Sequence, residues 1–218
     1  MSSLLSILGL GAGLGHILAD YRQSWTLTYW LKPITMICFV LLALLPGPGD
    51  PTYRYIIVAG LVLSLIGDVC LMLRPARFLA GLLAFLLAHL VYIGAFGRLA
   101  DDLWWPALLL AALVGVIMAR VLWSGAGRLR PAVLAYIAAI VLMVATAASA
   151  WHANADSGRL ALLVGALLFL ISDGVLGYAR FRHRFPAAQG IILGTYYPAQ
   201  WLIAASAGIF QLAPAASG

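Results

Sequence analysis

Long apolar runs alternate with short polar connections along the whole chain. Eight runs are each close to the ~20 residues that a helix needs to cross a bilayer, and they span about 3–19, 27–45, 55–73, 78–97, 104–123, 131–151, 160–179 and 187–212. Three prolines and two glycines at 46–51, and the segment Arg74-Pro75-Ala76-Arg77, predict tight turns between runs. The pattern predicts an all-α membrane protein with eight transmembrane helices, forming a single domain over residues 1–218.

The composition supports the same class. Of the 218 residues, 64% are hydrophobic and 9% are charged, against roughly 25% charged residues in a typical soluble domain. All seven acidic residues are Asp, and twelve of the thirteen basic residues are Arg, with Lys32 as the exception. The bases do not gather with aromatic residues on a soluble segment, so nucleic-acid binding is not expected.

Basic residues are distributed unevenly between the two sides of the predicted bundle. One side carries three of them, Arg54, Arg98 and Arg159. The other side, reached after the first, third, fifth and seventh runs, carries ten: Arg22, Lys32, Arg74, Arg77, Arg120, Arg128, Arg130, Arg180, Arg182 and Arg184. Because basic connections stay in the cytoplasm, both termini are predicted on the non-cytoplasmic side. The excess of Arg over Lys and the many Ala residues favour a bacterial inner membrane.

The first run has two features of a transmembrane helix. It lacks the basic start of a signal peptide, so we expect it to be a helix of the folded protein. Gly9, Gly11, Gly13 and Gly15 give it a face of small residues. Such a face predicts close packing against a neighbouring helix.

Two carboxyl groups lie inside apolar runs. Asp68 ends the sequence Leu-Ile-Gly-Asp, and Asp173, 105 positions later, ends the sequence Leu-Ile-Ser-Asp. An unpaired charge in a bilayer costs at least a few kcal/mol, so such residues mark functional sites. No base is expected at their depth, and two carboxyl groups that meet in a dry site share one proton. The sequence therefore predicts a buried acid pair.

The two aspartates belong to an internal repeat. A shift of 105 positions aligns Asp68 with Asp173 and also pairs Gly60 with Gly165, Leu63 with Leu168, Leu71 with Leu176, Arg77 with Arg182, and Tyr92 with Tyr197. Four helices in each half give both halves the same direction through the membrane. We therefore predict a 4+4 parallel repeat with pseudo-repeats at about 1–100 and 101–218.

Other polar groups are expected near the depth of the aspartates. They are Ser64, His89, Tyr92, Tyr136, Ser172, Thr195, Tyr196, Tyr197 and Gln200. Each alone is most simply explained by a hydrogen bond to a neighbouring helix. Lys32 alone is most simply an anchor that extends to the interface. Together with the aspartates they predict a cavity that opens to the cytoplasmic side, with Lys32 and Arg130 at its rim.

Several motifs resemble the YhhN-type membrane proteins, a family that includes the lysoplasmalogenases. The similarity runs from about residue 32 to 204 and rests on these segments: Lys32-Pro33, Ser64–Leu71, Phe78, Gly81, Phe85, Ala88-His89, Tyr92, Gly165, Phe169, Ser172-Asp173 and Tyr196–Ala204. The resemblance implies hydrolysis of the vinyl ether of a lysoplasmalogen, a lysophospholipid in the membrane. The products would be a fatty aldehyde and glycerophosphoethanolamine or glycerophosphocholine.

The implied reaction suits a pair of carboxyl groups. A vinyl ether is cleaved when an acid protonates the carbon distant from oxygen, which leaves an oxocarbenium ion for water to capture. One aspartate would donate the proton while the other stabilises positive charge and activates water. Lys32, with Arg130, would hold the phosphate. Tyr92, Tyr196, Tyr197, His89 and Gln200 would orient the carboxyl groups or the water, and no cofactor is expected.

Three other classes use similar residues. A proton-coupled transporter would use the aspartates as a relay, although no matched Gly or Pro break lies beside them. An intramembrane aspartyl protease with a Gly-x-Gly-Asp motif would need Gly in place of Leu65. A metal hydrolase needs several ligands on one site, and His16, His89, His152 and His183 lie in separate runs. Only His89 is expected near the acids, so we expect no metal.

Overall fold

The computed structural model describes residues 1–73 and 77–208. The α-helices in this part of the chain are α1 (Ser2–Tyr21), α2 (Trp25–Leu44), α3 (Pro51–Met72), α4 (Phe78–Gly97), α5 (Trp105–Ala126), α6 (Arg130–Ala153), α7 (Ser157–Phe181) and α8 (Ala188–Ser206). The short 3₁₀-helix η1 (Gly127–Leu129) joins α5 to α6. Residues 74–76 of the expected turn at 74–77, and the end of the last apolar run beyond 208, lie outside the described residues.

The prediction of an all-helical membrane protein is confirmed for the described residues, whose regular elements are all helices. Six segments are long and apolar enough to cross a membrane: Ser2–Tyr21, Trp25–Leu44, Pro51–Met72, Phe78–Gly97, Trp105–Ala153 and Ser157–Phe181. The fifth combines α5, η1 and α6, and α8 is not among the six.

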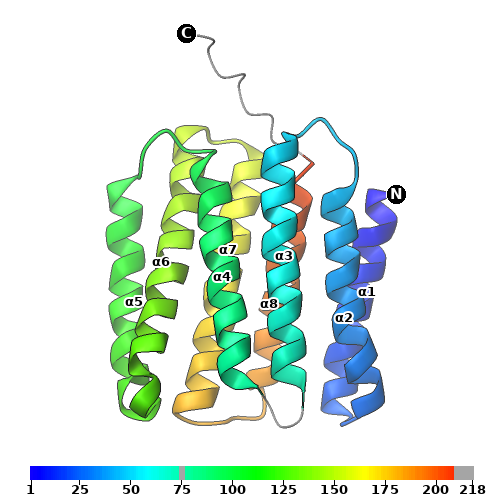
Figure 1. Ribbon diagram of the computed structural model, residues 1–218, viewed down its shortest axis with the longest axis vertical. Helices are drawn as coiled ribbons and strands as arrows, with labels where there is room; N and C mark the ends of the chain where they lie inside the picture. Colours follow the sequence, from blue (N-terminus) through cyan, green and yellow to red (C-terminus); the bar gives the residue numbers. More distant parts are fainter. Residues whose placement is uncertain (74–76, 209–218) are drawn as a thin grey trace.

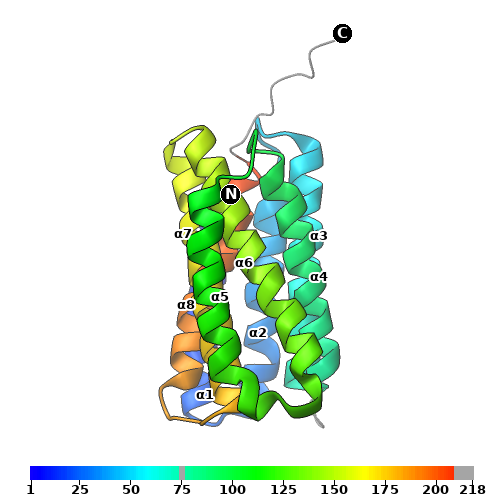
Figure 2. The same ribbon diagram turned by 90° about the vertical axis from the view of Figure 1, so that its left-hand side faces the viewer.

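The helices stand side by side in one bundle, and consecutive helices run in opposite directions (Figure 1). The α1–α2, α5–α6 and α7–α8 connections lie at the lower end in that view, and the N-terminus lies at the upper end. Helix α6 packs against α4, α5 and α7, while α1 packs against α2 and α8. Figure 2 shows α5 in front of the bundle, on its outer side.

Local sequence explains where several helices begin and end. Asp50 accepts a hydrogen bond from the backbone N–H of Tyr53 at 2.7 Å, and Pro51 follows it at the first helical position. Asp156 caps α7 in the same way through the N–H of Arg159, at 2.8 Å. These are strong helix-start features. Helix α5 ends at Ala126, and its C-cap is Gly127, whose φ of 50° favours glycine.

Close helix contacts depend on glycine. A Cβ on Gly60 of α3 would lie 2.3 Å from Cε1 of Tyr92 on α4, so only glycine leaves room for that ring. In α1, a Cβ on Gly9 would lie 2.6 Å from the Phe39 ring, and one on Gly13 would lie 2.8 Å from the Tyr197 ring. The predicted small face of α1 is therefore confirmed at these two positions.

Candidate active site

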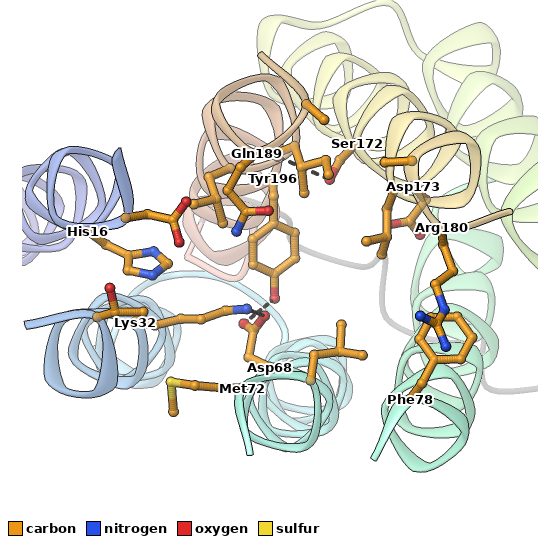
Figure 3. A pocket seen from close by; sticks show the side chains of 18 of the residues that line it. His16, Lys32, Asp68, Met72, Phe78, Ser172, Asp173, Arg180, Gln189 and Tyr196 are labelled. Carbon is orange, nitrogen blue, oxygen red and sulfur yellow. Dashed lines mark hydrogen bonds and ion pairs between the residues drawn. The ribbon is translucent and has the colours of Figure 1, made fainter. Parts of the chain in front are cut away.

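A cavity of about 660 Å³, seen from close by in Figure 3, lies at the end of the bundle that carries the α7–α8 connection. Its walls come from α1, α2, α3, α4, α7 and α8 and from the α7–α8 connection. The charged and polar side chains that line it include His16, Asp20, Thr28, Tyr29, Lys32, Asp68, Ser172, Asp173, Arg180, Arg184, Gln189 and Tyr196. Both predicted aspartates therefore reach the same cavity.

Asp68 is held by one cation and one phenol. Its side chain projects from α3 and the residue is only 3% exposed. The Lys32 ammonium lies 2.9 Å from Oδ1, and the Tyr196 hydroxyl donates a hydrogen bond to Oδ2 at 2.7 Å. The expectation that no base lies at this depth is wrong. Lys32 is in α2, which packs beside α3, and its long flexible stem lets the ammonium reach the carboxylate.

Asp173 has a different set of partners. It projects from α7 and accepts a hydrogen bond at Oδ2 from the Tyr136 hydroxyl of α6, at 2.5 Å. Nε2 of His89, on α4, lies 3.5 Å from the same oxygen. His89 Nδ1 is 2.6 Å from the carbonyl oxygen of Phe85. Because a carbonyl only accepts, Nδ1 carries the hydrogen, and a neutral ring then presents the lone pair of Nε2 to Asp173.

The two carboxyl groups do not share a partner. Asp68 is bonded from α2 and α8, whereas Asp173 is approached from α6 and α4. Among the described residues, no hydrogen bond joins one carboxyl group to the other. Figure 3 shows the two groups entering the hollow from different walls. The expected direct sharing of one proton is therefore not what this structure shows.

The other predicted residues divide into those that line the cavity and those that lie behind it. Ser172 lines it and donates a hydrogen bond to the backbone oxygen of Ile192 at 3.1 Å. Tyr92 donates to Gln200 Oε1 at 2.9 Å, and these two buried residues, like the buried Ser64, are not part of the lining. Tyr92, Gln200 and Ser64 therefore form a polar layer behind the cavity wall.

Two predictions about α8 are corrected in detail. The Tyr197 hydroxyl lies 2.6 Å from Nδ1 of His16 on α1, because neighbouring residues on a helix face different directions and only Tyr196 reaches an aspartate. Thr195 donates to the backbone oxygen of Ile191, in its own helix, at 2.8 Å. It therefore contributes to α8 itself and does not contact either aspartate.

The rim of the cavity differs from the expectation. Arg130 does not line the cavity: its Nε donates to the backbone oxygen of Trp123 at 3.0 Å, and its guanidinium lies 4.7 Å from the centre of that indole ring. Arg180 and Arg184 line the cavity instead. Arg130 starts α6, and α6 provides none of the residues that line the cavity.

Among the lining residues that sequence reasoning missed are His16, Asp20, Arg180, Arg184 and Gln189. A signal was present for four of them, because His16 and Asp20, like Arg180 and Arg184, are four residues apart near a cytoplasmic-side end of a run. Within the described part of the chain, no three His, Cys, Asp or Glu side chains gather as a metal-ligand set.

The fold and the cavity define a helical membrane protein with two separately bonded carboxyl groups at one buried site. Comparison with known proteins gives the family. The chain belongs to the YhhN family, whose model matches residues 27–207. No solved structure gives a significant match.

The relatives have two kinds of name. The membrane protein YhhN of Escherichia coli O157:H7 is 29% identical over 189 residues, which cover 86% of this chain and 90% of that protein. Human lysoplasmalogenase TMEM86B is 36% identical over 177 residues, covering 80% and 72%. Bovine lysoplasmalogenase TMEM86A is 33% identical over 198 residues, covering 87% and 81%.

Proposed function

We propose that the protein hydrolyses the vinyl ether bond of lysoplasmalogens and releases a fatty aldehyde and a glycerophospho-alcohol. The main observation behind the proposal is the pair of buried carboxyl groups, Asp68 and Asp173, which line one cavity. Asp68 has a cationic partner, Lys32, whereas Asp173 is bonded by the neutral phenol of Tyr136. The names of the human and bovine relatives support the same reaction.

The partners of the two aspartates favour a division of roles. An ammonium group 2.9 Å from Asp68 stabilises the carboxylate form, so Asp68 is assigned as the anion. Asp173 accepts a hydrogen bond from the Tyr136 phenol and faces a nitrogen of the His89 imidazole, and among the described residues it forms no ion pair with Lys or Arg. The phenol hydrogen bond favours the carboxylate, but burial without a cation, together with an imidazole lone pair that faces the same oxygen, favours the neutral carboxylic acid, so Asp173 is assigned as the proton donor.

The steps then follow with atoms in balance. Asp173 transfers its proton to the vinyl carbon distant from oxygen, and the Asp68 carboxylate stabilises the resulting oxocarbenium ion. Water adds to the cationic carbon and gives a proton back to Asp173, which forms a hemiacetal. The hemiacetal then breaks down: its hydroxyl proton is released, the bond between its carbon and the glycerol oxygen breaks, and the glycerol oxygen takes up a proton. The sum is one vinyl ether plus one water, giving one aldehyde and one alcohol.

The rim of the cavity suits a phosphate. Lys32 is engaged by Asp68, and Arg130 does not line the cavity, so we assign phosphate binding to Arg180 and Arg184. Guanidinium groups bind phosphate oxygens in pairs. Arg180 also lies 4.6 Å from the centre of the Phe78 ring, which holds it at the cavity wall.

The hydrocarbon tail needs an apolar space beyond the aspartates. A second void, about 40 Å³, lies between α3, α4, α5, α6 and α7 and shares five lining residues with the main cavity: Leu71, Phe78, Phe85, Asp173 and Leu176. Its other lining residues are apolar except for Tyr136. A void of this size holds only the first carbons of a chain, so we propose that the start of the tail enters it and that the vinyl ether lies beside Asp173.

The contacts of the aspartates also support the proposed 4+4 repeat in one domain of eight spanning helices. In a shift of four helices, α2 corresponds to α6 and α4 to α8. Asp68 is contacted from α2 and α8, and Asp173 from α6 and α4. Each aspartate therefore meets the preceding helix of its own half and the last helix of the other half. With the basic end in the cytoplasm, both termini would be non-cytoplasmic in a bacterial inner membrane.

The test uses detergent-purified protein and three lipids: a lysoplasmalogen, its saturated ether analogue and its acyl analogue. We expect aldehyde release from the first alone. Asp68→Asn and Asp173→Asn should each abolish release while the fold is retained. Turnover that persists in either variant would refute the two-carboxylate mechanism. Cleavage of the acyl analogue would indicate an esterase, and pH-driven flux in proteoliposomes without product would indicate a transporter.

A further inference from the structure

Helix α1 contributes to the cavity although it precedes the region that the family model matches, which begins at residue 27. His16 and Asp20, one helical turn apart, both line the cavity. Figure 3 shows His16 close to Lys32, on the wall formed by α1 and α2. The α1 part of this wall therefore lies outside the residues that the family model matches.

His16 is buried with one ring nitrogen satisfied and the other open. The residue is 1% exposed. Its Nδ1 lies 2.6 Å from the Tyr197 hydroxyl, and its Nε2 has no hydrogen-bond partner among the described residues. Buried polar atoms are almost always hydrogen-bonded, so an open nitrogen on the lining of a cavity points to a ligand.

The position of His16 is fixed by packing. Gly13, one turn earlier, lies so close to the Tyr197 ring that a Cβ would be 2.8 Å from it. The rings of His16 and Tyr197 meet edge to face, with 5.9 Å between their centres. The imidazole is thus held between α8 and the cavity and cannot turn to another partner without breaking the contact with Tyr197.

The chemistry of Nε2 selects the ligand group. The Tyr197 hydroxyl can donate to Nδ1 or accept from it, so Nε2 is either an N–H donor or a lone-pair acceptor. A hydroxyl group complements both forms, because it donates and accepts. In a lysolipid, the carbon that carries the free sn-2 hydroxyl lies between the vinyl ether and the phosphate.

We propose that His16 binds the free sn-2 hydroxyl of the substrate and thereby selects lysolipids over lipids with two chains. The proposal rests on the proposed function, which places the phosphate near Arg180 and the vinyl ether near Asp173 and so leaves the glycerol between them. An acyl chain at sn-2 removes the hydroxyl hydrogen and adds bulk against the His16 wall.

The experiment compares two vinyl ether lipids with the same headgroup and chain, one with the sn-2 hydroxyl and one with hydrogen in its place. For wild type we expect kcat/KM to be about tenfold higher with the hydroxyl, the effect of one hydrogen bond. In His16→Ala this ratio should fall to about one, mainly because the hydroxyl lipid becomes worse. His16→Gln, whose amide can also donate and accept, should retain part of the ratio.

The matched control is His152→Ala, because His152 stacks on Trp104, 4.4 Å between ring centres, and does not line the cavity. This variant should keep the wild-type ratio. If His16→Ala lowers kcat/KM equally for both lipids, or for neither, His16 does not bind the hydroxyl. If His16→Ala does not fold, the ratio in His16→Gln decides the matter, and a value above that of wild type contradicts the proposal.

Binding separates this proposal from the proposed function. Saturated 1-O-alkyl lysophospholipid and its 2-deoxy analogue cannot be hydrolysed as vinyl ethers, so their affinities for purified protein measure recognition alone. Hydroxyl-dependent binding that is lost in His16→Ala, in a protein without vinyl ether hydrolysis, supports His16 and refutes the proposed reaction. Hydrolysis without any hydroxyl preference supports the reaction and refutes the role of His16.

Discussion

Replacing Lys32 with Met tests the role of the buried ion pair directly. The ammonium and carboxylate are 2.9 Å apart, with side chains 11% and 4% exposed. At an effective dielectric constant near 20, two unit charges at this distance attract by about 6 kcal/mol. Desolvation offsets much of this attraction, and removing one partner of a buried pair costs about 3–5 kcal/mol. We expect Lys32→Met to lower the free energy of unfolding by that amount.

The double variant Lys32→Met/Asp68→Asn is the sharper test of the ion pair. It leaves no unpaired charge, so it should be at least ~2 kcal/mol more stable than the sum of the two single effects predicts. Asp68→Asn alone should cost less than Lys32→Met, because the lysine stem can carry its ammonium toward the cavity mouth.

Denaturation in detergent micelles, followed by tryptophan fluorescence, measures all four proteins. Aldehyde release should be absent from the double variant despite its recovered stability, because the assigned anion is gone. If the single effects add to within ~0.5 kcal/mol, the pair is not coupled and Lys32 does not determine the charge state of Asp68. Lys32→Arg is the control that keeps the charge.

Two further predictions concern the rim and the helix contacts. The double variant Arg180→Gln/Arg184→Gln should raise KM for the lysolipid about tenfold or more with a smaller change in kcat, since each charge-assisted hydrogen bond contributes ~1.5–3 kcal/mol. Arg130→Gln is the control. An equal rise in KM in this control would refute the assignment of phosphate binding to Arg180 and Arg184. Gly60→Ala should destabilise the protein by ~1–3 kcal/mol through overpacking. Gly94→Ala is the control: a Cβ at Gly94 would have no neighbouring atom within 4 Å, so this variant should leave stability unchanged or raise it. Equal unfolding transitions for the two variants would contradict the packing argument.

The apolar runs and the two acidic residues within them are enough to predict the helices and the importance of the two aspartates. Helix positions follow from apolar runs of membrane-spanning length, because backbone polar groups in lipid must be satisfied within the segment. The cost of a carboxyl group in such a run marked Asp68 and Asp173 as functional candidates. Helical spacing along one run also gives the depth of each polar residue, which explains why Tyr136, His89 and Tyr196 were expected near the aspartates.

Which side chains contact one another depends on how the helices are arranged in the bundle. Lys32 pairs with Asp68, and Tyr197 with His16, across 36 and 181 positions of sequence. Spacing within one helix says nothing about the order or rotation of its neighbours, which depend on close contacts such as that of Gly13 with Tyr197. For this reason the separate partners of the two carboxyl groups, the arginines at the rim and the contribution of α1 became visible only in the folded bundle.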